Sequence, residues 1–191
     1  MLLVLGCFAF LLMMFNDMNQ VKFHLRWGKY TFMAGCFLLL IVTGLLISRH
    51  LYDEKTFHIG HLAAAVLCMI NTLLLIYTLF FALPFEGTYV EQDHLKVYDQ
   101  GVYALCRHPG ILWFFFAYSF LAMTLSSIEI GIAAVLFSLM NLIYAYMQDR
   151  MIFPITLEGY EDYQKHVPFL IPTIASIKRV YNHERDGPYA F

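Results

Sequence analysis

Arginine, histidine and proline occupy positions 107–109, directly before an uncharged, aromatic-rich run from Ile111 to Ile128. Charged and polar side chains at the mouth of a membrane helix are costly unless they have partners there. Proline fits the first turn of a helix because its missing N–H would have been unpaired anyway. We therefore predict that His108 caps a helix and that Pro109 is its first residue. The free N–H groups behind them would then form an anion site at the membrane face.

A second set of polar side chains lies near the end of the last apolar run. Asn141, Tyr144 and Gln148 are spaced i, i+3, i+7, which places them on one face of a helix. Polar residues of membrane helices often form hydrogen bonds between helices, so packing and a functional site are both open interpretations. These three side chains point toward the membrane face at which His108 is expected, and this favours a functional site.

No metal or phosphate motif accompanies these residues. The chain has no H-E-x-x-H, no C-x-x-C, no carboxylate-rich set, no glycine-rich phosphate loop and no recognisable nucleophile motif. The net charge of −2 and the absence of a basic run argue against a nucleic-acid partner. We expect a small-molecule or lipid substrate, and neither a metal ion nor a nucleic acid.

The composition places these residues in a membrane protein, because 60% of the chain is hydrophobic and only 14% is charged. The apolar runs are Met1–Phe15, Tyr30–Ser48, His61–Pro84, Ile111–Ile128 and Ile130–Met147. The last four can each cross ~30 Å of hydrocarbon. The first is short but lacks the basic region and cleavage site of a signal peptide, so a retained helix is favoured over a signal peptide. We predict an all-α integral membrane protein of about five transmembrane helices in a single domain, residues 1–191.

The link between the fourth and fifth runs is very short, from Ser126 to Glu129. Such a link predicts an antiparallel helical hairpin, which brings Arg107 and His108 back near residues 144–152.

Basic residues predict the orientation of the chain. Segments 16–29, 85–110 and 148–191 carry ten Lys and Arg residues, and the opposite side carries Arg49 and Lys55 alone. We therefore expect the His-Pro loop and the C-terminal tail to face the cytoplasm, in an inner or plasma membrane. In the tail we expect a short amphipathic helix after Leu157, and then a segment at the interface.

Three motifs in the C-terminal half occur together: Gly101-Val-Tyr-x-x-x-x-His108-Pro109, Gln148-Asp149-x-x-Ile152 and Tyr160-x-x-Tyr163-x-x-x-Val167-Pro168. With the hairpin between the first two, they resemble the isoprenylcysteine carboxyl methyltransferase family, whose wider group includes phospholipid methyltransferases. The resemblance covers residues 94–172. It makes residues 85–172 the catalytic half, residues 1–84 three generic spans and residues 173–191 a tail.

The resemblance implies methyl transfer from S-adenosylmethionine, bound in a cytoplasmic pocket beneath the tail. The acceptor would be a carboxyl, amine or thiol of a small or lipidic substrate. The cofactor contacts that it implies are His94, Leu95, Val97, Tyr103, His108, Pro109, Gly110, Ile111 and Gln148. The cofactor's carboxylate would suit a helix N-terminus, and its sulfonium would suit tyrosine faces, through an attraction of ~1 kcal/mol or more.

The chain departs from the family pattern at two positions. Gln148 replaces an acid, which keeps hydrogen bonds and loses the charge. Tyr144 stands where prenylcysteine enzymes carry the arginine that holds the substrate carboxylate. Such a carboxylate would lack its ion pair here, at a cost of roughly several kcal/mol, which disfavours a prenylcysteine substrate. Arg150 could substitute only with its side chain turned inward, so Tyr144 and Arg150 are the candidate catalytic residues.

Two alternatives stay open. An NADPH-dependent membrane reductase of the sterol-reductase type has a similar C-terminal arrangement, but it needs basic residues for the cofactor phosphates, and this tail offers few. A non-catalytic membrane protein that keeps the fold is the other, and Tyr144 and Gln148 at the family's charged positions favour it.

Overall fold

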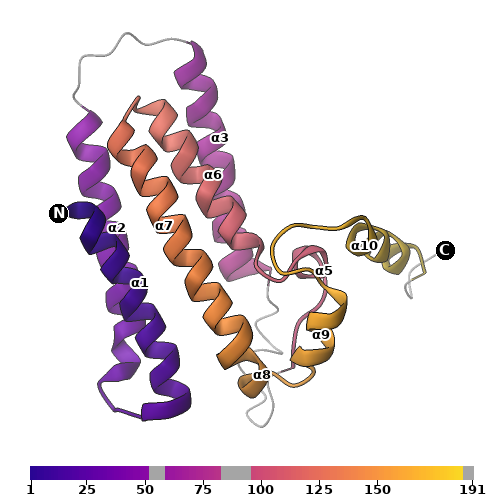
Figure 1. Cartoon of the computed structure of the whole chain (residues 1–191). Helices are drawn as coiled ribbons and strands as arrows, with labels where there is room; N and C mark the ends of the chain where they lie inside the picture. Colours follow the sequence, from indigo (N-terminus) through magenta and orange to yellow (C-terminus); the bar gives the residue numbers. More distant parts are fainter. Residues whose placement is uncertain (52–58, 83–95, 187–191) are drawn as a thin grey trace.

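The computed structural model describes residues 1–51, 59–82 and 96–186, and the regular secondary structure within these ranges is helical (Figure 1). Its α-helices are α1 (Leu2–Met18), α2 (Thr31–Leu51), α3 (Ile59–Ile76), α5 (Val102–Leu105), α6 (Pro109–Thr124), α7 (Ile128–Met147), α8 (Phe153–Thr156), α9 (Tyr160–His166) and α10 (Ile174–Asp186). π-Helical turns follow α1, α3 and α7, at Asn19–Phe23, Tyr77–Phe81 and Gln148–Ile152, and a 3-10 turn at Gly28–Tyr30 precedes α2. The described residues contain no strand beyond an isolated bridge between Lys96 and Glu158.

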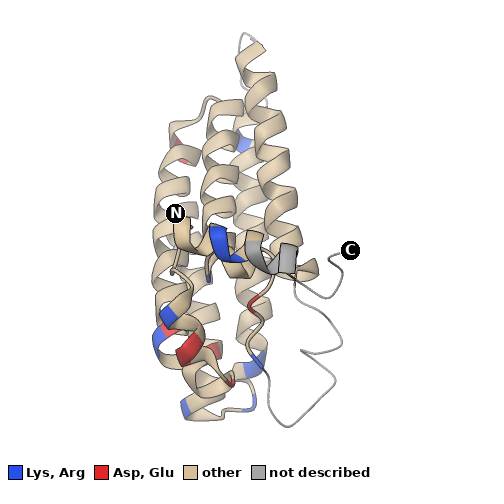
Figure 2. Cartoon of the chain, turned by 90° about the vertical axis from the view of Figure 1, so that its right-hand side faces the viewer, with Lys and Arg blue, Asp and Glu red and all other residues tan. Residues whose placement is uncertain are grey.

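Four of the helical segments are long and apolar enough to cross a membrane: Leu2–Phe23, Gly28–Leu51, Ile59–Phe81 and Ile128–Thr156. They indicate a membrane protein, as the composition predicted. The fifth predicted span is α6, whose 16 residues extend about 24 Å, less than the ~30 Å of the hydrocarbon core. Most of the Lys and Arg residues lie toward one end of the bundle (Figure 2).

The predicted helical hairpin is confirmed, and so is the residue at which its first helix begins. His108 occupies the N-cap position of α6 without a side-chain capping hydrogen bond, and Pro109 is the first residue of the helix. α6 ends earlier than the apolar run because Ser126 adopts a left-handed conformation with φ of 46°. The hydroxyl of Ser127 then accepts a hydrogen bond from the Ile130 N–H, at 3.3 Å, and so caps α7.

The bundle places α1 between α2 and α7, and α6 between α7 and α3. Its centre is the fully buried Phe137, whose ring lies 6.4 Å from that of Phe10 and 5.7 Å from that of Tyr118. Gly6 lies against the same ring, because a Cβ atom at Gly6 would be 2.1 Å from it. Close approach of backbones through small residues is a main source of helix association in membranes.

Gly35 provides a second close approach, and we predict that Gly35→Ala lowers the free energy of unfolding by about 1–3 kcal/mol. Its added Cβ would lie 2.6 Å from the backbone oxygen of Ala9, which cannot turn away as a side chain can. Gly44→Ala on the same helix is the control, because no atom lies within 4 Å of the added Cβ. Denaturant titration in detergent should show a loss for the first variant alone, and equal stability of the two variants would contradict the prediction.

The tail contains two helices. α9 is the short helix predicted after Leu157, whereas α10 was not predicted. A reciprocal capping box starts α10: the Thr173 N–H donates to the Ser176 hydroxyl at 3.0 Å, and the Ser176 N–H donates to the Thr173 hydroxyl at 3.2 Å. α10 lies crosswise to the bundle in both views (Figures 1 and 2).

Candidate functional site

The hairpin brings Arg107, just before α6, onto Asp149, just after α7, as the sequence predicted. The guanidinium meets the carboxylate through two hydrogen bonds, from Nε at 2.8 Å and from a terminal nitrogen at 3.1 Å. The other terminal nitrogen donates to the backbone oxygens of Gln164 and Val167, at 2.9 and 2.8 Å. The Asp149 side chain is 1% exposed, so this bidentate pair is desolvated.

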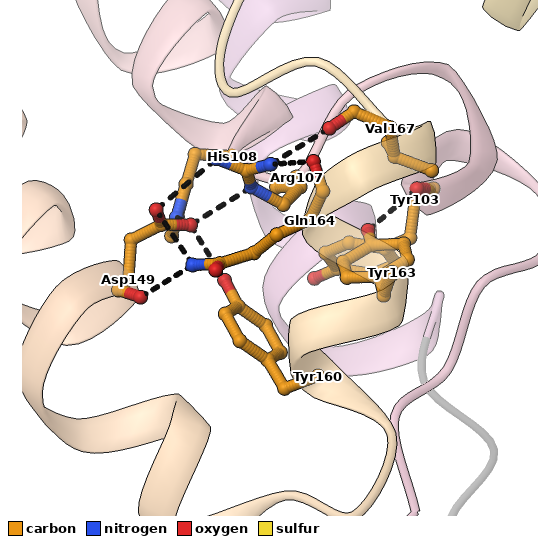
Figure 3. A network of polar contacts seen from close by, with 8 residues as sticks. All are labelled: Tyr103, Arg107, His108, Asp149, Tyr160, Tyr163, Gln164 and Val167. Carbon is orange, nitrogen blue, oxygen red and sulfur yellow. Dashed lines mark hydrogen bonds and ion pairs between the residues drawn. The ribbon is translucent and has the colours of Figure 1, made fainter.

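The tail completes the surroundings of Asp149 (Figure 3). The Tyr160 hydroxyl donates to its Oδ1 at 2.7 Å, and the Gln164 amide donates to its Oδ2 at 3.1 Å and to its backbone oxygen at 2.7 Å. The His108 Nε2 atom lies 3.4 Å from Oδ1. One carboxylate therefore joins the loop before α6, the end of α7 and helix α9.

Backbone and tyrosine contacts hold the tail against the His-Pro loop. The N–H groups of Arg107 and His108 donate to the carbonyls of Pro168 and Phe169, at 2.9 and 3.1 Å. The Tyr163 hydroxyl donates to the carbonyl of Tyr103 at 2.6 Å, and the Tyr103 hydroxyl donates to that of Thr78, in the turn after α3, at 2.8 Å.

Burial changes the acidity of these tyrosines. Desolvation, with a smaller contribution from nearby Cys106, raises the pKa of Tyr103 to about 12. Burial raises the pKa of Tyr163 as well, and burial together with the Asp149 carboxylate raises that of Tyr160. All three phenols therefore remain protonated donors at neutral pH.

Two neighbouring hollows open at this end of the molecule. One, of about 430 Å³, is lined by Asp149, Arg150, Pro154, Glu161, Gln164 and Lys165. The other, of about 470 Å³, runs along residues 154–162 and Lys165. Their volumes are within the range of small-molecule sites, although both are open to solvent, and carboxylates and at least one cationic side chain line each of them.

The structure brings only some of the predicted cofactor residues together. His108 joins the Asp149 network, with its ring 6.0 Å from that of Phe153 and 4.8 Å from that of Phe169. Pro109, Gly110 and Ile111 form the first turn of α6. Tyr103 connects the loop to the turn after α3, as described above.

Val97 lies beside helix α9. The Val97 N–H donates to the Glu158 carbonyl at 3.1 Å, and the Val97 side chain packs against the α9 tyrosines. His94 and Leu95 lie outside the described residues.

Gln148 and the candidate catalytic residues Tyr144 and Arg150 lie apart from the Asp149 carboxylate. The Tyr144 hydroxyl and the Gln148 amide each donate to Oδ2 of Asp17 on α1, at 2.8 Å. The Asn16 amide donates to Oδ1 of Asp17 at 3.1 Å, and Asp17 is 9% exposed. Arg150 is exposed, and its guanidinium lies 5.7 Å from the centre of the Tyr146 ring.

Sequence reasoning did not assign Asp17 or Gln164 to a site. Asp17 had one signal, since an acid in an otherwise uncharged helix calls for partners. Gln164 had none, because its role depends on how α9 docks. Among the described residues, no group of three or more His, Cys, Asp or Glu side chains is arranged to hold a metal ion.

Comparison of the chain with protein-family models, curated proteins and solved structures found no match.

Proposed function

We propose that the protein is an S-adenosylmethionine-dependent methyltransferase of the membrane, with its site where the hairpin meets the tail. One observation carries the proposal: Arg107 and His108, from the loop before α6, converge on Asp149 just after α7, and Tyr160 and Gln164 close the arrangement from the tail. Of these residues, His108, Asp149 and Tyr160 belong to the three motifs that resemble the isoprenylcysteine carboxyl methyltransferase family.

The donor set fits the cofactor. The methionine part of S-adenosylmethionine carries an ammonium and a carboxylate, and the hollow of about 430 Å³ offers Glu161 to the ammonium, and Arg150 and Lys165 to the carboxylate. The aromatic rings of Tyr146, Phe153 and Phe169 lie around this end of the molecule and suit a sulfonium. When bound, the cofactor supplies a methyl group on a positively charged sulfur.

The protein's own residues would align the reactants. Transfer of a methyl group needs alignment more than a general base, so the saturated hydrogen bonding of Asp149 is compatible with a positioning role. The acceptor would be a small or lipidic substrate that enters between the helices. The Tyr144 hydroxyl donates to Asp17, so Tyr144 gives a substrate carboxylate no positive charge at the position where prenylcysteine enzymes carry an arginine. We propose that the bundle has five spans, including α6. We place the site on the cytoplasmic side of an inner or plasma membrane, because the segments at this end of the bundle carry most of the basic residues.

A non-catalytic membrane protein is the second candidate, and one observation favours it. Both carboxylate oxygens of Asp149 already accept hydrogen bonds from protein groups, and Arg107 donates to four protein acceptors. Such a closed network holds the tail in place whether or not a ligand binds.

Thermal unfolding in detergent with S-adenosylmethionine, S-adenosylhomocysteine and NADPH in parallel tests the proposal. A ligand at 100 times its dissociation constant stabilises the folded state by about 2.7 kcal/mol. We expect both S-adenosyl compounds to raise the melting temperature. Stabilisation by NADPH alone would identify a reductase, and no response to any of the three would favour the non-catalytic protein.

Two histidine variants locate the site. His108→Asn keeps a residue that is preferred at the N-cap but removes the imidazole that lies near the rings of Phe153 and Phe169. This variant should abolish the rise in melting temperature that S-adenosylhomocysteine produces. His166→Ala alters an exposed residue of α9 and should keep the full shift. If His108→Asn also kept it, the site would lie elsewhere.

A further inference from the structure

An exposed apolar surface runs along α10, outside every candidate membrane span. Ile174, Ile177 and Tyr181 are 75%, 52% and 66% exposed. Their spacing of three and four residues places them on one side of the helix. Ile171, just before the helix, is 72% exposed and extends this surface. An apolar side of this kind is unfavourable in water and calls for an apolar partner.

The protein itself covers a different side of α10. Ser176 is fully buried, and α10 packs against α5, the short helix that leads into the His-Pro loop. The chain just before α10 is fixed as well, because the carbonyls of Pro168 and Phe169 accept hydrogen bonds from Arg107 and His108. α10 is therefore held beside the start of α6, crosswise to the bundle (Figures 1 and 2).

Basic residues complete an amphipathic pattern. Lys178 follows Ile177 and borders the apolar side. Arg179 is two residues after Ile177, about 200° around the helix, and so points away from the apolar side. Both side chains are exposed. A lysine beside an apolar face can bury its stem and extend its ammonium to lipid headgroups. A helix of 13 residues extends only about 20 Å and does not cross a bilayer.

We propose that α10 is an interfacial helix that binds an anionic membrane surface, with Ile174, Ile177 and Tyr181 among the acyl chains and Lys178 at the headgroups. Lipid is the occupant that the molecule favours. The helix is attached where α6 begins, the four long helices already expose apolar side chains, and the charge at the edge of the apolar side complements anionic lipids. This inference does not depend on the proposed methyltransferase activity.

Tryptophan quenching in the full chain tests the proposal. The native tryptophans are replaced in a Trp27→Phe, Trp113→Phe background, and one tryptophan is introduced by Ile177→Trp or by Arg179→Trp. The protein is reconstituted in phosphatidylcholine with brominated acyl chains, with and without phosphatidylglycerol, and iodide serves as the quencher from water. We expect the bromolipid to remove most of the fluorescence of the Ile177→Trp protein and iodide to remove most of that of the Arg179→Trp protein.

Three results would overturn the proposal or part of it. Equal quenching of both proteins by iodide would place the apolar side in water. If neither bromolipid nor iodide quenched the Ile177→Trp protein, another part of the protein would cover the apolar side of α10. The Ile174→Trp protein repeats the measurement at a second position on that side. Lys178→Gln, added to Ile177→Trp, should remove any gain in lipid quenching that phosphatidylglycerol produces. An unchanged gain would contradict the role of Lys178 at anionic headgroups.

Discussion

Replacement of Arg107 by methionine is expected to lower the free energy of unfolding by about 3–5 kcal/mol, because it leaves a buried carboxylate without its cation. Methionine has a similar length and no charge, so the change removes the ion pair with little change in volume. The Arg107 side chain is 10% exposed and that of Asp149 is 1% exposed, so water cannot replace the lost partner. Two backbone carbonyls, of Gln164 and Val167, lose their donor at the same time. Denaturant titration in detergent measures the loss.

Lys165→Met is the matched control. Lys165 also forms an ion pair, with Asp162 at 3.6 Å, but the two side chains are 69% and 72% exposed. Exposed pairs contribute about 0–1 kcal/mol, so this variant should be nearly as stable as the native protein. Equal losses in the two variants would show that burial does not decide the strength of the Arg107 pair.

A double variant separates the ion pair from general packing. Asp149→Asn, added to Arg107→Met, removes the unpaired charge, and we expect it to recover part of the loss. Fully additive losses would mean that the two side chains act independently, in conflict with the two hydrogen bonds between them.

The sequence predicted the parts of this arrangement that follow from local patterns. The short link after Thr124 permits only an antiparallel hairpin, so the meeting of Arg107 with the end of α7 needed no knowledge of the rest of the chain. Proline after His108 likewise marked the first turn of α6, because proline lacks the N–H that a helix start leaves unpaired.

The parts that were not predicted depend on tertiary packing or on weak local signals. Asp17 reaches Tyr144 across 127 positions of the chain, and no pattern in either segment indicates which helix packs beside which. Helix α10 was missed because its start, a Thr173–Ser176 capping box directly after Pro172, lacks the usual Glu or Gln of that motif.

Removal of the Asp17 carboxylate should have the second large effect. Asp17→Leu leaves the Tyr144 hydroxyl and the Gln148 amide without an acceptor in an apolar bundle. Each unsatisfied buried donor costs about 1–3 kcal/mol, so we expect the free energy of unfolding to fall by at least the cost of one. Tyr144→Phe, added to Asp17→Leu, removes one orphaned donor and should restore part of the stability.

Asp17→Asn distinguishes an acceptor requirement from a charge requirement. Asparagine keeps the shape and one carbonyl oxygen, which can still accept from Tyr144 or Gln148, so its loss should be well below that of Asp17→Leu. The variant also bears on the proposed cofactor site, because Asp17 holds the amide of Gln148, one of the residues that the resemblance assigns to the cofactor. If the function proposed above is correct, Asp17→Leu should weaken the stabilisation by S-adenosylhomocysteine more than Asp17→Asn does. Equal losses of stability in the two variants would instead mean that the negative charge of Asp17 stabilises the bundle, with a cationic partner other than Tyr144 and Gln148.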